Sequence, residues 1–197
     1  MQPSFDETYW TQRYENLQTG WDIGRVSPPL KAYADQLTDA AITILIPGSG
    51  NSYEAAYLYN NGFKKVFIVD ISAHPLKNFL AHHPEFPPEQ ALHQDFFSLQ
   101  GQYDLILEQT FFCALPPAQR PQYAEKMHDL LKPGGKLAGV LFDDPLYDDH
   151  PPFGGNKEEY LNYFEPHFHI RKMERCYNSL PPRQGRELFI LLEKPTR

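Results

Sequence analysis

Two glycines and an aspartate stand where they could bind the polar parts of a nucleoside. Gly48 and Gly50, with Ser49 between them, follow an apolar run at residues 42–48, so a tight turn would expose backbone N–H groups at the start of a helix. Asp70 ends the next apolar run, and a carboxylate about 20 residues after such glycines typically meets the two hydroxyls of a ribose. The plainer interpretations are an ordinary strand-to-helix turn and a solvated acid or one that caps the helix expected after it.

The helix that follows the glycines argues against a dinucleotide. Tyr53 stands at the position of the third glycine in Gly-x-Gly-x-x-Gly, where a small residue lets the helix pack close to a pyrophosphate. A nucleoside ligand without a pyrophosphate is therefore favoured. S-adenosylmethionine is a common one, and its amino-acid carboxylate suits exposed backbone amides. A nicotinamide-dependent oxidoreductase on a similar sheet remains the less favoured alternative.

Asp95 and Phe96, in a third apolar run at residues 91–97, would complete such a site. A carboxylate can accept a hydrogen bond from the exocyclic amine of adenine, while an aromatic ring packs against the base. Taken alone, the same segment fits equally well a loop acid beside two core phenylalanines.

Alternating strands and helices must position these residues. Runs rich in Val, Ile, Leu and Phe predict strands at residues 42–48, 64–72, 91–97, 103–112 and 135–144, with helical spacing at 51–61 and 118–131. This alternation predicts a doubly wound α/β fold with a mostly parallel sheet, in which ligands bind beyond the carboxyl ends of the strands. Residues 169–177 and 186–194 predict an antiparallel hairpin at the edge of the sheet.

An aromatic stripe precedes the first strand, with Phe5, Tyr9, Trp10 and Tyr14 at helical spacing within residues 4–17. We expect this segment to cap one end of the sheet. Because the sequence has no internal repeat and no linker-like shift in composition, we expect one domain over residues 1–197. Residues 1–40 would form its N-terminal cap segment and residues 41–197 its doubly wound core.

Composition excludes several classes of function. The chain has 197 residues, 18 Lys+Arg against 25 Asp+Glu and a net charge of -7, without the basic cluster that binds nucleic acid. No apolar stretch approaches the roughly 20 residues that span a bilayer. The first residues lack the pattern of a secretory signal, and two cysteines are too few for a disulfide framework. We expect a cytoplasmic monomer with no nucleic-acid or membrane partner.

Several segments together resemble class I S-adenosylmethionine-dependent methyltransferases, in the branch of thiopurine S-methyltransferases and plant-type halide/thiol methyltransferases. They are TGWDIGRVSPPL (19–30), LIPGSGNSYEAAYL (45–58), VDIS (69–72), QTFFCALPPAQRPQYAEKMHDLLKPGGKL (109–137) and DPLYDDHPPF (144–153). The resemblance implies a seven-stranded sheet with an antiparallel last strand and an N-terminal helical lid that closes over S-adenosylmethionine.

The resemblance also implies roles for individual residues. Trp10 and Trp21 would line the cofactor pocket, where aromatic faces attract the sulfonium cation. Ile71, in the matched VDIS segment, and Gln109, after the fourth strand, would join the cofactor site. Arg120 matches a substrate-contacting arginine. Two departures are Ser49, where many relatives have Cys, and Gln109, where some halide-type relatives have Tyr.

Methyl transfer from a sulfonium is an in-line displacement, so a soft nucleophile needs alignment and exclusion of water more than a general base. We therefore assign no catalytic base. We expect no metal, because adjacent acids in a Pro-rich loop, such as Asp143, Asp144, Asp148 and Asp149, are usually solvated. The sequence predicts transfer to a thiol or thiopurine sulfur, or to halide. A noncatalytic S-adenosylmethionine-binding module is the alternative from another class.

Overall fold

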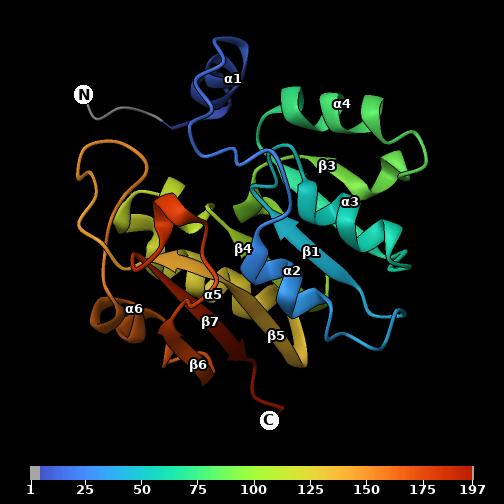
Figure 1. Ribbon diagram of the computed structural model, residues 1–197. Coiled ribbons are helices and arrows are strands. Elements are labelled where there is room, and N and C mark those ends of the chain that lie inside the picture. The colour runs from blue at the N-terminus through green and yellow to red at the C-terminus, as the bar shows by residue number, and fades with distance from the viewer. Residues whose placement is uncertain (1–4, 197) are drawn as a thin grey trace.

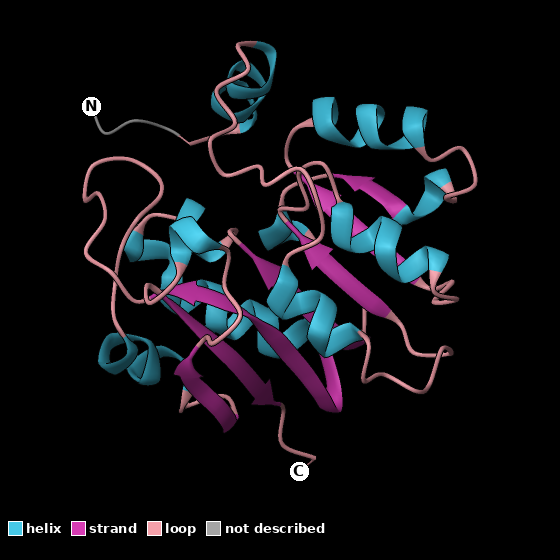
Figure 2. Ribbon diagram, viewed as in Figure 1, coloured by secondary structure: helices cyan, strands magenta, loops and turns pink. Residues whose placement is uncertain are grey.

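A seven-stranded sheet runs through the middle of the computed structural model, which describes residues 5–196 (Figures 1 and 2). Its strands are β1 (Ile44–Pro47), β2 (Val66–Asp70), β3 (Ala91–His93), β4 (Tyr103–Gln109), β5 (Leu131–Phe142), β6 (His169–Arg175) and β7 (Glu187–Glu193). They lie in the order β3-β2-β1-β4-β5-β7-β6. The order reverses between β1 and β4, and the crevice beyond such a reversal is where open sheets of this kind bind ligands.

The first five strands are parallel, whereas β7 is antiparallel to both β5 and β6. This confirms the predicted mostly parallel sheet with an antiparallel last strand. The predicted hairpin is also at the edge, with β7 inserted between β5 and β6. The carboxyl ends of β1, β2, β4 and β5 therefore meet along one edge of the sheet.

Helices cover both faces of the sheet. They are α1 (Glu7–Glu15), α2 (Pro28–Ala34), α3 (Tyr53–Asn60), α4 (Ala73–His82), α5 (Arg120–Leu130) and α6 (Lys157–Phe164). Alternate residues of β1 show how the core is divided, because Ile44 and Ile46 pack with α2, α3 and α4. Leu45 points to the opposite face and packs with α5 and α6. Both faces are thus dry, as expected for parallel strands with apolar runs.

Two strands depart furthest from their predicted bounds. β3 ends at His93, because the Asp95 carboxylate accepts from the backbone N–H of Phe97 and caps a 3-10 turn at Phe96–Ser98 instead. β5 begins at Leu131 rather than at residue 135. Its pairing with β4 jumps from Tyr103↔Leu131 to Leu105↔Lys136, so the Pro-Gly-Gly segment forms an irregularity inside the strand.

The N-terminal helix α1 lies over the carboxyl edge of the sheet and contacts the first turn of α4, where the Tyr14 and His74 rings stack (Figure 1). Asp6 caps it by accepting from the backbone N–H of Tyr9. Two side-chain contacts fasten it: Thr11 Oγ1 lies 2.8 Å from Ser72 Oγ, and Glu7 Oε1 lies 2.9 Å from His93 Nε2. This arrangement agrees with the predicted cap over one end of the sheet.

Within residues 5–196, none of the helices is both long enough and apolar enough to cross a lipid bilayer.

Candidate functional site

The turn after β1 has the backbone conformation that glycine permits. Gly48 and Gly50 have φ values of 56° and 51°, in the left-handed region. A Cβ at Gly48 would lie 2.3 Å from Cδ2 of Phe111, and one at Gly50 would lie 3.1 Å from the Tyr14 hydroxyl. Both glycines are therefore required, for the backbone angle and for the close approach of aromatic side chains.

Asp70 joins this turn to the end of β2. Its Oδ2 accepts from the backbone N–H of Gly50 at 3.0 Å, and its Oδ1 accepts from that of Ser72 at 2.9 Å. Burial raises the pKa of Asp70 to about 6, against the opposing effect of these two hydrogen bonds. Asp70 thus organises the start of α4, as the plainer interpretation predicted, and also lies beside the glycine turn, as a ribose-binding acid would.

A cavity of about 50 Å³ opens at this edge between the glycine turn and the N-terminal segment. Its wall contains three residues predicted from sequence on the turn (Gly48, Ser49, Gly50) and two more of the predicted set, Trp21 and Gln109. The remaining lining residues are Asp22, Ile23, Arg25, Ile46, Asn51, Tyr53, Glu54 and Thr110.

Two polar atoms of the cavity-lining residues have no hydrogen-bond partner in the described part of the chain. They are Ser49 Oγ and Gln109 Oε1, both buried. A buried oxygen without a partner costs roughly 1 to 3 kcal/mol. A ligand that brings N–H or O–H donors to this cavity would remove that cost, so the wall suits a polar ligand end.

Trp21, on the cavity wall, is held by contacts with residues from both the N-terminal and the C-terminal parts of the chain. Arg183, in the turn before β7, donates from Nη2 to the Trp21 carbonyl oxygen at 2.9 Å. The indole ring packs edge-on against Trp10 at 5.5 Å and against Tyr14 at 5.6 Å between centroids. The N-terminal segment therefore presents an aromatic surface beside the glycine turn.

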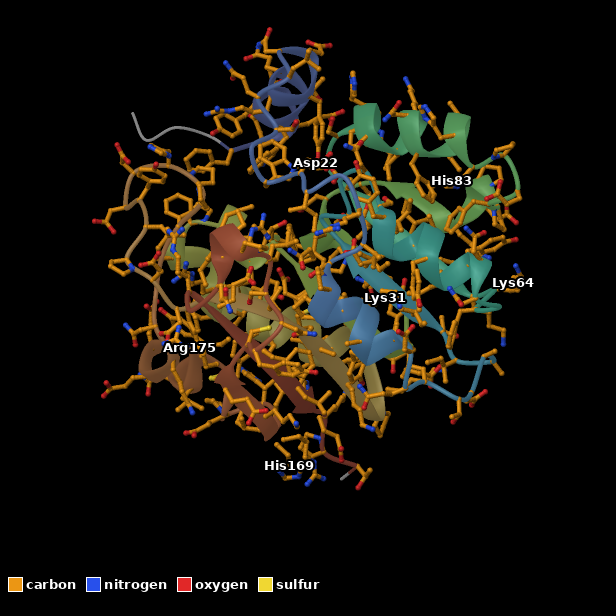
Figure 3. All side chains as sticks on the ribbon, in the orientation of Figure 1. Asp22, Lys31, Lys64, His83, His169 and Arg175 are labelled. Atoms are coloured by element: carbon orange, nitrogen blue, oxygen red, sulfur yellow. The ribbon has the colours of Figure 1, made fainter. Side chains whose placement is uncertain are left out.

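The two acids of the cavity wall are already engaged. Asp22 accepts from Asn51, Tyr53 and the backbone of Gly24. Figure 3 shows Asp22 close to α1 at one end of the molecule, while His169 lies at the opposite end. Glu54 accepts from the backbone N–H of Ser27 at 2.8 Å, and burial raises its pKa.

A buried carboxylate supports the segment after β4. Glu108 is fully buried and accepts from the backbone N–H groups of Phe111 and Phe112 at 2.7 and 2.9 Å. The Tyr123 hydroxyl donates to its other oxygen at 2.6 Å. Burial raises the pKa of Glu108 to about 7. Nearby Cys113 is buried, which raises the pKa of its thiol to about 12 and leaves it protonated.

Asp70 is not among the residues that line the cavity, and neither are four other predicted cofactor residues, Trp10, Ile71, Asp95 and Phe96. Trp10 packs against Trp21, which lines the cavity, and the Trp10 Nε1–H donates to the Phe5 carbonyl. Ile71 follows β2, and its carbonyl oxygen lies 3.1 Å from His93 Nε2. Asp95 is exposed and serves as the cap described above, and Phe96 is buried against Phe111 at 5.1 Å between centroids.

Arg120 is placed away from the cavity. Its side chain is 1% exposed, pairs with Glu159 at 2.9 Å and donates to the Gly154 carbonyl at 2.7 Å. Within residues 5–196, no three His, Cys, Asp or Glu residues form a group that could hold a metal ion.

Sequence reasoning missed three residues that shape the site. Asp22 and Arg25 were inside the segment TGWDIGRVSPPL, but only its tryptophan was assigned a role. Arg183 carries no local signal, because its partner Trp21 is 162 residues away.

Comparison with known proteins gives a consistent result. The family model for thiopurine S-methyltransferase matches residues 5–195. Probable thiol methyltransferase 2 of Arabidopsis thaliana is 30% identical over 162 residues, covering 80% of this chain and 71% of that protein. Thiocyanate methyltransferase 1 of Brassica oleracea is 27% identical over 190 residues, covering 92% and 83%.

The fold is likewise shared with a solved structure. A Burkholderia thailandensis 1,6-didemethyltoxoflavin-N1-methyltransferase, crystallised with its substrate and S-adenosylhomocysteine, superposes with a TM-score of 0.76. The two chains are 16% identical, with 96% of this chain and 87% of the other covered, so the likeness is one of fold.

Proposed function

This chain belongs to the thiopurine S-methyltransferase family and is an S-adenosylmethionine-dependent methyltransferase for thiol-type sulfur; we propose that the cavity at Gly48–Gly50 is where it binds the cofactor. The observation that carries the proposal is the bond from the Gly50 N–H to Asp70 beside that cavity. This hydrogen bond supports a single site, because it holds Asp70 against the glycine turn at the reversal of strand order.

The residues present fit the cofactor. Asp70 offers a carboxylate to ribose hydroxyls, and the unpartnered Ser49 Oγ and Gln109 Oε1 offer acceptors to an ammonium group. We propose that Asp95 and Phe96 contact the adenine of the cofactor, and that the backbone of Ile71 lies beside the adenine. When bound, S-adenosylmethionine supplies a methyl group on a positively charged sulfur, ready for displacement.

Trp21, supported by Trp10, would face that positive charge. A cation over an aromatic face gains about 0.5 to 2 kcal/mol, more when water is excluded. Arg183 holds the Trp21 backbone and so keeps the ring at the cavity mouth.

The protein's contribution to the reaction is alignment and exclusion of water. A thiolate or hydrosulfide is already electron-rich, so its attack on the methyl carbon needs no proton acceptor.

Cofactor entry would need the N-terminal segment to move. Pockets for small molecules usually have volumes of about 300 to 1,000 Å³, whereas this cavity has about 50 Å³. Within residues 1–40, our proposed lid, the part before α2 carries Tyr14 and Trp21 and is the part that would move, because Leu30 and Ala34 of α2 are buried against the sheet.

The acceptor is tested by a panel. Purified protein is given S-adenosylmethionine and hydrosulfide, small thiols, thiocyanate, a thiopurine or iodide, and S-adenosylhomocysteine and methylated products are measured, including those in the headspace. We expect sulfur acceptors to be used in preference to halide. Tight cofactor binding without turnover on any acceptor would favour the noncatalytic module, and enhanced NADH fluorescence on binding would favour the oxidoreductase.

We further propose that the protein acts in the cytoplasm as a monomer without a nucleic-acid partner. Support comes from its acidic charge and from Cys113 and Cys176, both free thiols.

A further inference from the structure

Arg120 begins α5 beneath the segment that follows β5, here called the β5–α6 loop (residues 143–156). Its Nη1 donates to Glu159 at 2.9 Å, and its Nη2 donates to the carbonyls of Gly154 at 2.7 Å and Phe153 at 3.4 Å. Its guanidinium carbon lies 4.7 Å from the ring centroid of Phe112. A planar cation with fixed donors is thereby matched to two carbonyls, one carboxylate and an aromatic face.

The loop end that Arg120 holds is closely packed. Phe153 N–H donates to the Cys113 carbonyl at 2.7 Å. A Cβ at Gly154 would lie 2.3 Å from the Leu146 nitrogen, and one at Gly155 would lie 2.4 Å from the Tyr160 hydroxyl. This part of the loop therefore has one tight arrangement, and Arg120 forms its floor.

The loop reaches the same edge of the sheet as the cofactor cavity. It leaves the carboxyl end of β5 and rises on the side where α1 lies (Figure 1). The Phe153 ring packs edge-on against Phe5, just before α1, at 5.6 Å between centroids. The loop thus contacts the N-terminal segment just before α1.

The remaining donor of Arg120 decides between two roles. Its Nε is buried and has no partner among the described residues. An acceptor could reach Nε only by entering beneath the loop, since the side chain is 1% exposed. A direct contact with the acceptor therefore requires the loop to be displaced, whereas the hydrogen bonds to the Phe153 and Gly154 carbonyls hold the loop in place.

We propose that Arg120 is a positioning residue, which fixes the β5–α6 loop as the acceptor-side wall through the Phe153 and Gly154 carbonyls and Glu159. The inference rests on the proposed function for the meaning of that wall. It differs from the sequence expectation that Arg120 touches the acceptor itself.

The test uses Arg120→Lys, which keeps the charge and loses the forked geometry, and Glu159→Ala, which removes the anionic partner. Arg171→Lys is the matched control, because Arg171 lies on the edge strand β6 and pairs with Glu193 of β7. Three readouts are compared: hydrogen exchange at the Phe153 and Gly155 amides, kcat/KM for an anionic acceptor (hydrosulfide) and for a neutral thiopurine, and affinity for S-adenosylhomocysteine.

If Arg120 positions the loop, both variants speed exchange at the two amides and lower kcat/KM for both acceptors by a similar factor, at least about tenfold in Arg120→Lys. Affinity for S-adenosylhomocysteine changes by less than about threefold from that of the wild type. This is smaller than a tenfold change, which corresponds to about 1.4 kcal/mol. The Arg171→Lys control changes none of the three.

Two results would overturn the inference. Unchanged amide exchange with a loss confined to hydrosulfide would make Arg120 a direct anion contact. An equal loss of cofactor affinity and acceptor turnover would make it only a folding element. If Arg120→Lys does not fold, Glu159→Ala decides on the same readouts. If the unmodified protein turns over no acceptor, the proposed function fails, while the exchange comparison still shows whether Arg120 holds the loop.

Discussion

The Asp70 carboxylate accepts a hydrogen bond from the backbone N–H of Gly50 over 3.0 Å, and so ties the ends of β1 and β2 together. The same carboxylate is 7% exposed and has a pKa raised to about 6 by burial. Its charge at neutral pH is therefore set by its surroundings, and a ligand that donates hydrogen bonds to it would stabilise the ionised form.

Cofactor affinity should consequently depend on pH through Asp70. Ribose hydroxyls need the ionised carboxylate, so affinity for S-adenosylhomocysteine should fall as the pH is lowered from 8 to 5, approaching tenfold per pH unit below the pKa. Asp70→Asn should bind at least about tenfold more weakly at pH 8 and show a much flatter profile. Calorimetric titration measures both. A variant profile that follows the wild type would remove Asp70 from the ribose site.

Gly48 offers a steric test of the cavity. Gly48→Ala would place a methyl group against Phe111 and force φ of 56° on a residue with a side chain. We expect at least about a tenfold loss of S-adenosylhomocysteine affinity. Gly62→Ala is the control, because Gly62 also has a positive φ, of 96°, but a Cβ there would meet nothing within 4 Å. Equal affinity in both variants would show that the turn does not touch the ligand.

The tryptophans provide a direct probe, since both tryptophans of the chain, Trp10 and Trp21, pack together in the N-terminal segment. Cofactor binding should change their fluorescence, and Trp10→Phe should retain that change. Trp21→Leu should weaken binding of cationic S-adenosylmethionine relative to neutral S-adenosylhomocysteine by about two- to thirtyfold. Equal weakening of both ligands would mean that Trp21 contributes packing alone.

Glu108 should make stability depend on pH. Because its pKa in the folded state is raised to about 7, its contribution to the free energy of unfolding is fully present below the ordinary glutamate pKa. That contribution is lost as the pH rises through about 7. Between pH 5 and pH 8 the free energy of unfolding of the wild type should therefore fall by roughly 2 kcal/mol more than that of Glu108→Gln. Urea unfolding at the two pH values gives the difference, and identical losses would contradict the assignment.

Most of the sheet follows from local sequence. Apolar runs buried on both faces mark β1, β2 and β4, and the glycines with Asp70 fall at strand ends because each run stops there. The strand predicted at residues 91–97 was wrong beyond His93, because the Asp95 carboxylate accepts from the backbone N–H of Phe97 and starts a turn. Such capping competes with strand pairing and leaves no mark in an apolar pattern.

The parts of the site that depend on distant contacts could not be predicted. Gln109 and Trp21 were assigned through the family resemblance, and the structure places both on the cavity wall. Arg183 reaches Trp21, and Arg120 reaches Gly154, only after the chain has folded, so spacing along the sequence carries no information about either pair. Arg120, matched by motif, is thus buried beneath a loop and does not line the cavity that Gln109 and Trp21 line.

Transfer of a labelled methyl group tests the central claim most directly. Protein, S-adenosylmethionine with a trideuterated methyl group, and hydrosulfide are mixed at limiting cofactor, and labelled methanethiol is followed by mass spectrometry. We predict that the wild type forms labelled methanethiol and that Asp70→Asn forms it at least about tenfold more slowly. Excess cofactor should reduce this difference in rate between the two proteins. No labelled product from hydrosulfide or any other sulfur acceptor, or equal rates for the two proteins at limiting cofactor, would contradict the account.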